Sequence, residues 1–146
     1  FNAYIDNIIP IVIITITALF LGYFYTAPPI RLVARNGLGE ISIFTVFGPL
    51  MVLGTGFAIF NGNFLVSSYF NDLLLTSVPI GLLTTNILLI NEFPDYEGDL
   101  KTGKNHLVVT FGKKNSRYIY LINLFIISLI TFYLSITINP ILISYV

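Results

Sequence analysis

Four long apolar stretches without charge constrain this chain more than any other feature. Asp, Glu, Lys and Arg are absent from residues 7–30, 41–71, 73–91 and 118–146. The strongly apolar spans inside these stretches cover about 8–25, 41–60, 73–91 and 118–138. Each approaches the roughly 20 residues that a helix needs to cross a bilayer. Lipid offers the backbone no hydrogen bonds, so a helix is expected for each span.

Composition points to lipid as the surrounding solvent. Only 10% of the 146 residues are charged, whereas a soluble domain has about 25%. Mean hydropathy is +0.87. Buried helices of a large soluble protein are the alternative, but four such runs in one short chain argue against it. The sequence therefore predicts an all-α, multi-span transmembrane bundle.

Charge is balanced in total but strongly polarised along the chain. The net charge is zero, so nothing favours nucleic acid as a partner. All Lys and Arg residues lie between the first and second spans or between the third and fourth: Arg31, Arg35, Lys101, Lys104, Lys113, Lys114 and Arg117. Alternating crossings place both loops on one side, which the positive-inside rule makes cytoplasmic.

The chain ends suggest a longer protein. The sequence opens at Phe1 with no initiator Met and no basic region before the first apolar run, so it does not resemble a signal peptide. It closes at Val146 inside an apolar run. We therefore expect both ends to be cut. The lack of cysteine excludes disulfides and thiolate metal sites.

The polar segment that follows the third span carries candidate chemistry. Asn91, Asp95 and Asp99 are spaced four residues apart, and such side chains share one helix face. Mg²⁺ prefers oxygen ligands and is usually held by one or two carboxylates plus substrate phosphates. Lys101 and Lys104 follow and could pair with phosphate oxygens. The column predicts a Mg²⁺-diphosphate site with Asp95 and Asp99 as its catalytic carboxylates.

Two considerations weigh against this prediction. Pro94 disrupts a regular helix interior, so we expect a break there and a new short helix starting at Pro94. A solvated loop of mixed charge, without a metal, is the alternative interpretation of this acidic segment. The segment's position at a span end, its added Asn and its following lysines bring the two interpretations into balance, so the residues alone do not decide between them.

The same segment resembles the second aspartate-rich motif of the UbiA superfamily of intramembrane prenyltransferases. Residues 103–109 followed by Phe111-Gly112 are similar to the stretch after that motif, and residues 25–31 to the end of the family's fourth helix. Residues 37–41, with Phe47-Gly48-Pro49 and Gly54-Thr55, resemble the fifth helix of the branch that prenylates 1,4-dihydroxy-2-naphthoate in menaquinone biosynthesis.

This resemblance implies part of a nine-helix bundle with a central cavity, in an integral membrane protein of a prokaryotic cell membrane. The chain would hold four full spans plus the start of a fifth. Two Asp-rich motifs would hold Mg²⁺ and a polyprenyl diphosphate at its cytoplasmic mouth. Ionisation would release diphosphate and leave an allylic cation, which an aromatic acceptor attacks.

The resemblance also assigns expected roles to residues of this chain. Asn91, Asp95 and Asp99 would be metal ligands, Lys104 and Arg31 would contact diphosphate, and Tyr25 would line the cavity mouth. The family's first motif is absent from this sequence. We therefore expect the chain alone to show no turnover.

Further candidates have plainer explanations. Phe44, Phe47 and Tyr120 could stabilise a carbocation, but packing or lipid contact is the expected role of each. Glu40 could orient the acceptor or act as a base, although a carboxylate that snorkels to the interface is favoured. His106, the single histidine, is expected to be an exposed loop residue.

Other functions remain open from the residues alone. The acceptor could be 4-hydroxybenzoate, a haem, a chlorin or a glycerol phosphate. A transporter segment would place ionisable residues in mid-span, and an assembly subunit would need no cluster of Asp and Lys. The charged residues of this sequence gather at the span ends, so the prenyltransferase is favoured.

Overall fold

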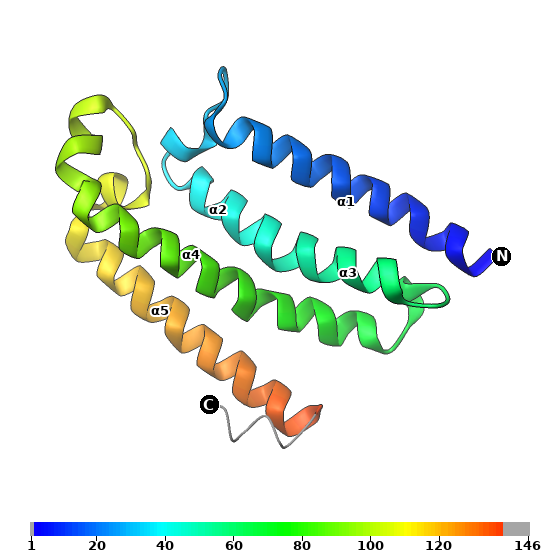
Figure 1. The fold of residues 1–146 in the computed structure, drawn as a ribbon. Coiled ribbons are helices and arrows are strands. Elements are labelled where there is room, and N and C mark those ends of the chain that lie inside the picture. Colours follow the sequence, from blue (N-terminus) through cyan, green and yellow to red (C-terminus); the bar gives the residue numbers. More distant parts are fainter. Residues whose placement is uncertain (1, 139–146) are drawn as a thin grey trace.

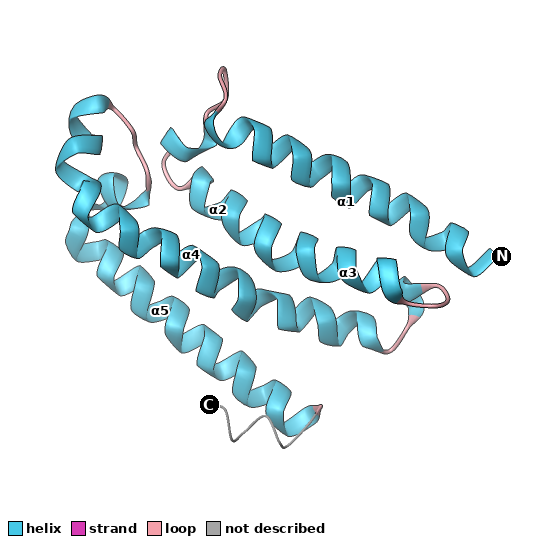
Figure 2. Cartoon of the chain, in the orientation of Figure 1, coloured by secondary structure: helices cyan, strands magenta, loops and turns pink. Residues whose placement is uncertain are grey.

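The computed structural model describes residues 2–138 of the chain. In this part of the chain there are helices and no named strand (Figure 2). The helices run in the order α1 (Asn2–Thr26), η1 (Leu32–Ala34), α2 (Leu38–Thr45), η2 (Val46–Leu50), α3 (Met51–Ile59), η3 (Phe64–Val66), α4 (Tyr69–Thr102) and α5 (Leu107–Thr137). Here η1 and η3 are 3-10 turns, and η2 is a π-helical turn.

The long helices lie side by side in one layer (Figure 1). The segment α2–η2–α3 forms one nearly continuous rod, which packs against α1 on one side and α4 on the other. The far side of α4 packs against α5. Each rod therefore makes its extensive contacts with the rods before and after it in the chain.

The four predicted spans are confirmed as helices long and apolar enough to cross a membrane. Two are longer than their apolar runs, because polar residues continue the helix beyond the apolar stretch at the basic end of the layer. In α5 the backbone departs from helical geometry at Gly112, which has φ +78°. The expected start of a fifth span falls in residues 139–146, outside the described part.

The prediction of a helix break at Pro94 is wrong. Helix α4 runs through both Pro79 and Pro94. Figure 1 shows α4 changing direction near its C-terminal end, which fits the lost hydrogen bond and ring clash of a proline inside a helix. Pro49 lies instead in the π-helical turn, a type of turn that commonly accompanies such distortions.

Small residues bring the α2–α3 rod close to α4. A Cβ atom added at Gly48 would lie 2.7 Å from the Ser77 carbonyl oxygen and 3.0 Å from Gly81 Cα. A Cβ added at Gly81 would lie 2.8 Å from the Phe44 carbonyl oxygen. The two backbones therefore touch where glycines face each other, as is common between membrane helices.

The opposite end of the layer is closed by the loop between α3 and α4. The Asn7 amide donates to the Phe60 and Gly62 carbonyl oxygens at 3.2 and 2.8 Å, and its oxygen accepts from the Phe64 N–H at 3.1 Å. The ring of Phe64 packs edge-on against Phe57, with centroids 4.9 Å apart. This end carries no Lys or Arg.

Candidate functional site at the basic end of the helices

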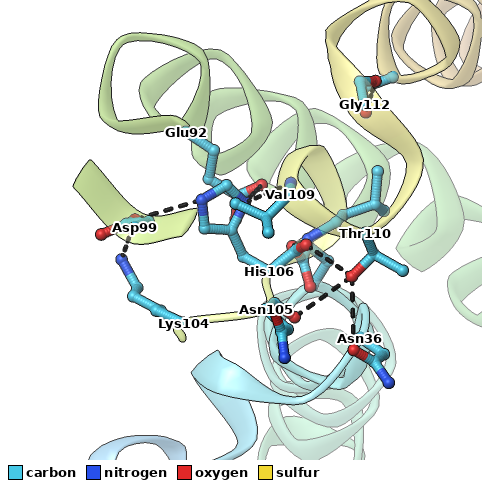
Figure 3. Close-up of polar contacts among 12 residues, drawn as sticks. Asn36, Glu92, Asp99, Lys104, Asn105, His106, Val109, Thr110 and Gly112 are labelled. Carbon is cyan, nitrogen blue, oxygen red and sulfur yellow. Dashed lines mark hydrogen bonds and ion pairs between the residues drawn. The ribbon is translucent and has the colours of Figure 1, made fainter. Parts of the chain in front are cut away.

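The two basic loops meet at one end of the layer, as the charge pattern predicts. Arg35 and Asn105 form an isolated parallel bridge, and the Asn36 N–H donates to the Asn105 carbonyl oxygen at 2.5 Å. The Thr110 hydroxyl donates to the His106 carbonyl oxygen at 2.9 Å and lies 3.5 Å from Asn36 Oδ1 (Figure 3). These contacts join α1, α2, α4 and α5 around one polar site.

The first loop is fixed by its own arginine. The Arg35 guanidinium donates to the Ile30 and Pro29 carbonyl oxygens at 2.7 and 3.0 Å. Arg31, which the resemblance assigns to diphosphate, has a left-handed backbone at φ 49° and is exposed. Of the two arginines, Arg35 holds the loop together, while Arg31 projects a solvent-exposed charge at the same end.

The second loop reverses the chain and returns a lysine to the acidic column. Helix α4 ends at Gly103, whose φ of +69° suits a residue without a Cβ. The Lys104 N–H then donates to the Asp99 carbonyl oxygen at 3.0 Å. The Lys104 ammonium pairs with Asp99 Oδ2 at 2.8 Å. The loop thus pairs the last carboxylate of the column with a cation.

The predicted column lies on one uninterrupted helix. Asn91, Asp95 and Asp99 all belong to α4, with Asn91 and Asp95 exposed and Asp99 partly buried. Lys101 is exposed near the end of the same helix. Two members of the column are therefore open to a ligand, and the third contacts the loop.

Tyr25 lines a small cavity near this site. The cavity has a volume of about 220 Å³ and lies between α1 and the α2–η2 segment, with apolar walls that include Leu21 and Phe47. Of the other aromatic candidates, Phe44 packs on Gly81, and Tyr120 accepts a hydrogen bond through its backbone from Asn86 at 3.3 Å. The packing role expected of Phe44 agrees with its contacts.

Two expectations about single residues are wrong. Glu40 does not snorkel to the interface: it is 2% exposed, and its Oε1 accepts the Leu107 N–H at 2.6 Å. His106 is not an exposed loop residue: it is 1% exposed and caps α5, with Nδ1 accepting the Val109 N–H at 3.4 Å. Both were misjudged because their burial comes from the docking of α5 against α2 and α4.

A third buried residue, Glu92, completes a cluster with these two. Glu92 is 5% exposed, and its Oε2 lies 3.2 Å from His106 Nδ1. The other ring nitrogen of His106, Nε2, lies 3.2 Å from Asp99 Oδ2. Figure 3 shows the imidazole between these carboxylates. The imidazole thus links the buried cluster to the acidic column.

The electrostatic setting of His106 favours the neutral imidazole. Burial lowers the pKa of His106 below its ordinary value, and Asp99 acts in the opposite direction by favouring the charged ring. Lys104, which pairs with Asp99, lowers this pKa further. The ring is therefore an acceptor at one nitrogen at neutral pH.

A comparison with protein families matches residues 4–146 to the UbiA prenyltransferase family. The chain belongs to the UbiA prenyltransferase family. Four membrane-length helices in this UbiA chain also make it an integral membrane protein with several spans. No solved structure gives a significant match.

Several characterised relatives are similar to this UbiA chain. It is 35% identical over 114 residues to 2-carboxy-1,4-naphthoquinone phytyltransferase of Synechocystis sp., covering 78% of this chain and 35% of that protein. It is 38% identical over 81 residues to 1,4-dihydroxy-2-naphthoate octaprenyltransferase of Escherichia coli (strain K12), covering 56% and 24%. It is 31% identical over 118 residues to UbiA prenyltransferase domain-containing protein 1 of Dictyostelium discoideum, covering 80% and 32%. The chain spans about a third or less of the length of these relatives.

The donor set of the column suits Mg²⁺. Asp95 and Asp99 supply carboxylate oxygens and Asn91 an amide oxygen, all hard ligands of the type that Mg²⁺ prefers. Asp99 already shares its charge with Lys104. Asp95 is exposed, and no ion pair involves it in residues 6–138. These residues of the UbiA chain therefore fit the predicted ion.

The sequence carried one signal for Glu92 that the prediction did not use. Thr85, Leu89 and Glu92 are spaced four and three residues apart, and all three are buried. That spacing marks a single helix face. A carboxylate that continues an inward-facing row is a candidate for a buried site. Asn91, one residue earlier, lies on the exposed face.

Proposed function

We propose that this chain forms part of a Mg²⁺-dependent prenyltransferase that moves a polyprenyl group from a polyprenyl diphosphate to 1,4-dihydroxy-2-naphthoate. The supporting observation is the Asp95–Asp99 column beside Lys104, at the basic end of four membrane-length helices, in a chain matched to the UbiA family. Relatives named for naphthoate prenylation support this acceptor class.

Binding of the donor would use the charged rim. Asn91, Asp95 and Asp99 would hold Mg²⁺, which when bound stabilises the negative charge that develops on the leaving diphosphate. The Lys104 ammonium has three N–H donors. One is directed to Asp99 Oδ2, and the others are available to phosphate oxygens. Lys101 and Arg31 add exposed cations at the same rim.

The reaction would break the bond between the allylic carbon and the diphosphate oxygen. The aromatic ring of the acceptor would then form a carbon–carbon bond to the allylic cation and lose a proton. The apolar helices would keep water away from that cation. Tyr25 and Phe47 line an apolar cavity between α1 and α2 that lies next to this rim.

A chimeric enzyme tests this proposal directly. The matching segment of the Escherichia coli naphthoate octaprenyltransferase would be replaced by this chain and assayed in membranes with labelled octaprenyl diphosphate, naphthoate acceptor and Mg²⁺. We expect product from the chimera and none from the 146-residue chain alone, because its sequence holds a single Asp column.

Two matched variants of the chimera locate the chemistry. Asp95→Asn should reduce kcat/KM by about 100-fold or more, since it removes charge from a metal-binding carboxylate. Glu97→Gln removes an exposed carboxylate two residues away, on another face of α4, and should change kcat/KM by less than about twofold. Equal losses in both variants, or full activity in Asp95→Asn, would contradict the proposed site.

The same chimera distinguishes other acceptors. Product with 4-hydroxybenzoate but not with naphthoate would retain prenyl transfer and reject the proposed acceptor. Normal turnover by the isolated chain would contradict the expectation that a second Asp column is needed.

A further inference from the structure

Three polar side chains of this site are almost fully buried, and the proposed reaction gives them no role. Glu40, Glu92 and His106 are 2%, 5% and 1% exposed. In the part of the chain that the structure describes, one buried polar atom of each has no hydrogen-bond partner: Glu40 Oε2, Glu92 Oε2 and His106 Nε2. Buried carboxylates and imidazoles ordinarily have partners. A ligand that bridges these side chains would supply the missing partners.

We infer that Glu40, Glu92 and His106 bind a divalent transition-metal ion, such as Zn²⁺ or Mn²⁺, at a site separate from the Asp95–Asp99 column. One ligand atom from each residue lies within 4.8 Å of the other two. This inference concerns the chain itself and holds whichever acceptor the enzyme uses.

A divalent cation would match the charge of the deprotonated ligand set. Metal binding requires deprotonated carboxylates, and a buried carboxylate is tolerated only when it is paired. The nearby cation, Lys104, is engaged by Asp99 at 2.8 Å. A divalent ion would make the cluster neutral.

The distances agree with shared coordination. Zn²⁺ bonds to nitrogen and oxygen ligands are about 2.0–2.2 Å long, so two ligands of one ion lie about 3–3.5 Å apart. Glu92 Oε2 and His106 Nδ1 are 3.2 Å apart. Glu40 is held by the bond between its Oε1 and the Leu107 N–H, which leaves Oε2 for the ion. The bond that Nδ1 already accepts from Val109 is long, at 3.4 Å, and is readily replaced.

The outer ring nitrogen also has the partner typical of a metal-bound histidine. Such a histidine usually directs its second ring N–H to a carboxylate or carbonyl, which fixes the ring. His106 Nε2 lies 3.2 Å from Asp99 Oδ2, although its N–H is not yet aligned for a hydrogen bond. An ion at Nδ1 would thus be coupled through the ring to the last carboxylate of the column.

The ligands of this site favour a different type of metal ion from the ligands of the Asp95–Asp99 column. Imidazole suits Zn²⁺ and related ions, and carboxylates also suit Mn²⁺. Mg²⁺ prefers oxygen ligands and retains several waters, which a cluster with 1–5% exposure does not accommodate. Excess Mg²⁺ should therefore leave this site occupied by the transition metal.

Manganese binding to the chain provides the test. The 146-residue chain would be purified in detergent without a polyhistidine tag, stripped of metal with a chelator and titrated with Mn²⁺. Electron paramagnetic resonance reports the free ion. We expect one Mn²⁺ per chain that excess Mg²⁺ does not displace and Zn²⁺ does. Pulsed spectra should show coupling to a ¹⁴N nucleus, which can come only from His106 among imidazoles because the sequence has one histidine.

Variants assign the site. His106→Asn removes the imidazole but keeps a residue suited to the helix N-terminal cap, and should abolish the ¹⁴N coupling and weaken Mn²⁺ binding by at least about tenfold. Glu92→Gln keeps the side-chain shape and should also weaken Mn²⁺ binding. This variant provides a second measurement if His106→Asn fails to fold. Asp95→Asn should leave this Mn²⁺ bound, because Asp95 belongs to the column.

The outcomes are decisive in either direction. Retention of Mg²⁺-resistant Mn²⁺ in Asp95→Asn, with its loss in His106→Asn or Glu92→Gln, supports the site. Complete displacement by Mg²⁺, no nitrogen coupling, or loss of binding only in Asp95→Asn would overturn it. None of these results depends on prenyl transfer, so failure here leaves the chimera experiment to judge the proposed reaction independently.

Discussion

Neighbouring side chains on α4 lie in different environments. Asn91 is exposed, whereas Glu92 is buried against His106. Successive residues on a helix point about 100° apart, so one turn can offer oxygen ligands on one face and a buried carboxylate on another. Asp99 belongs to the column and also approaches His106 at 3.2 Å. The column and the buried cluster are thus distinct in exposure but linked through single atoms.

At the end of the helices opposite the candidate site, the hydrogen bonds of Asn7 should stabilise the fold. Asn7→Ala removes two donated bonds and leaves the buried Phe64 N–H without its acceptor. We expect the free energy of unfolding to fall by about 1–3 kcal/mol, the usual cost of an unsatisfied buried polar group. Thermal unfolding in detergent, followed by far-UV circular dichroism, would measure this loss.

The matched control for Asn7 lies in the same loop. Asn61 is exposed, so Asn61→Ala should leave the unfolding temperature within about a degree of the parent. Equal stability of the two variants would mean that the Asn7 hydrogen bonds do not hold the loop.

At the scale of elements, the glycine contact between the α2–α3 rod and α4 sets how closely these helices approach. Gly48 and Gly81 face each other across this contact, and either Cβ would meet backbone atoms at 2.7–2.8 Å. Helix association in lipid depends on close packing rather than on the hydrophobic effect. Glu40 and Glu92 lie on these same two rods, Glu40 on α2 and Glu92 on α4.

A pair of glycine substitutions on α4 should have opposite effects. Gly81→Ala places a methyl group 2.8 Å from Phe44 atoms, and overpacking of this kind costs about 1–3 kcal/mol. Gly98→Ala meets nothing within 4 Å among the residues that the structure describes and should gain up to about 1 kcal/mol from helix propensity. Unfolding temperatures of the two variants, measured against the parent, would test both signs. A stabilising Gly81→Ala would contradict the close approach.

Much of each element could be predicted from the sequence, and the failures have physical causes. The spans followed from hydropathy and length because lipid leaves a helix as the only simple choice. The break expected at Pro94 failed because α4 continues through Pro94 to Thr102. The burial of Glu40 and His106 could not be predicted, since it arises where the first residue of α5 meets α2, through the bond between Leu107 and Glu40, 67 residues apart in sequence.

At the scale of the whole molecule, the positions of the charged residues agree with the way in which the loops connect the helices. Every Lys and Arg of the sequence lies in or beside the two loops that meet at Arg35 and Asn105, and the Asn61–Asp72 loop at the other end has none. The spacing of the column could likewise be read from the sequence. The functional roles of its residues and of the lysines that follow stay predictions until the variants are assayed: Asn91, Asp95, Asp99, Lys101 and Lys104.

Cysteine labelling would test the orientation of the layer. The chain has no native cysteine, so single substitutions at the exposed residues Asn61 and Thr102 can be labelled with a membrane-impermeant maleimide. In intact cells we expect labelling at position 61 and protection at position 102, because the positive-inside rule predicts that the basic loops face the cytoplasm. The reverse pattern would contradict the orientation expected from charge, and labelling of both would contradict an odd number of crossings between them.

The single-layer arrangement has a consequence for biogenesis. Since each rod makes its extensive contacts with the rods next to it in the chain, every hairpin can pair as soon as its second helix leaves the ribosome. The buried Glu40 carboxylate gains its Leu107 partner only after the chain has been synthesised to the first residue of α5. The polar cluster can thus close only once α2, α4 and the start of the fourth rod are all present during translation.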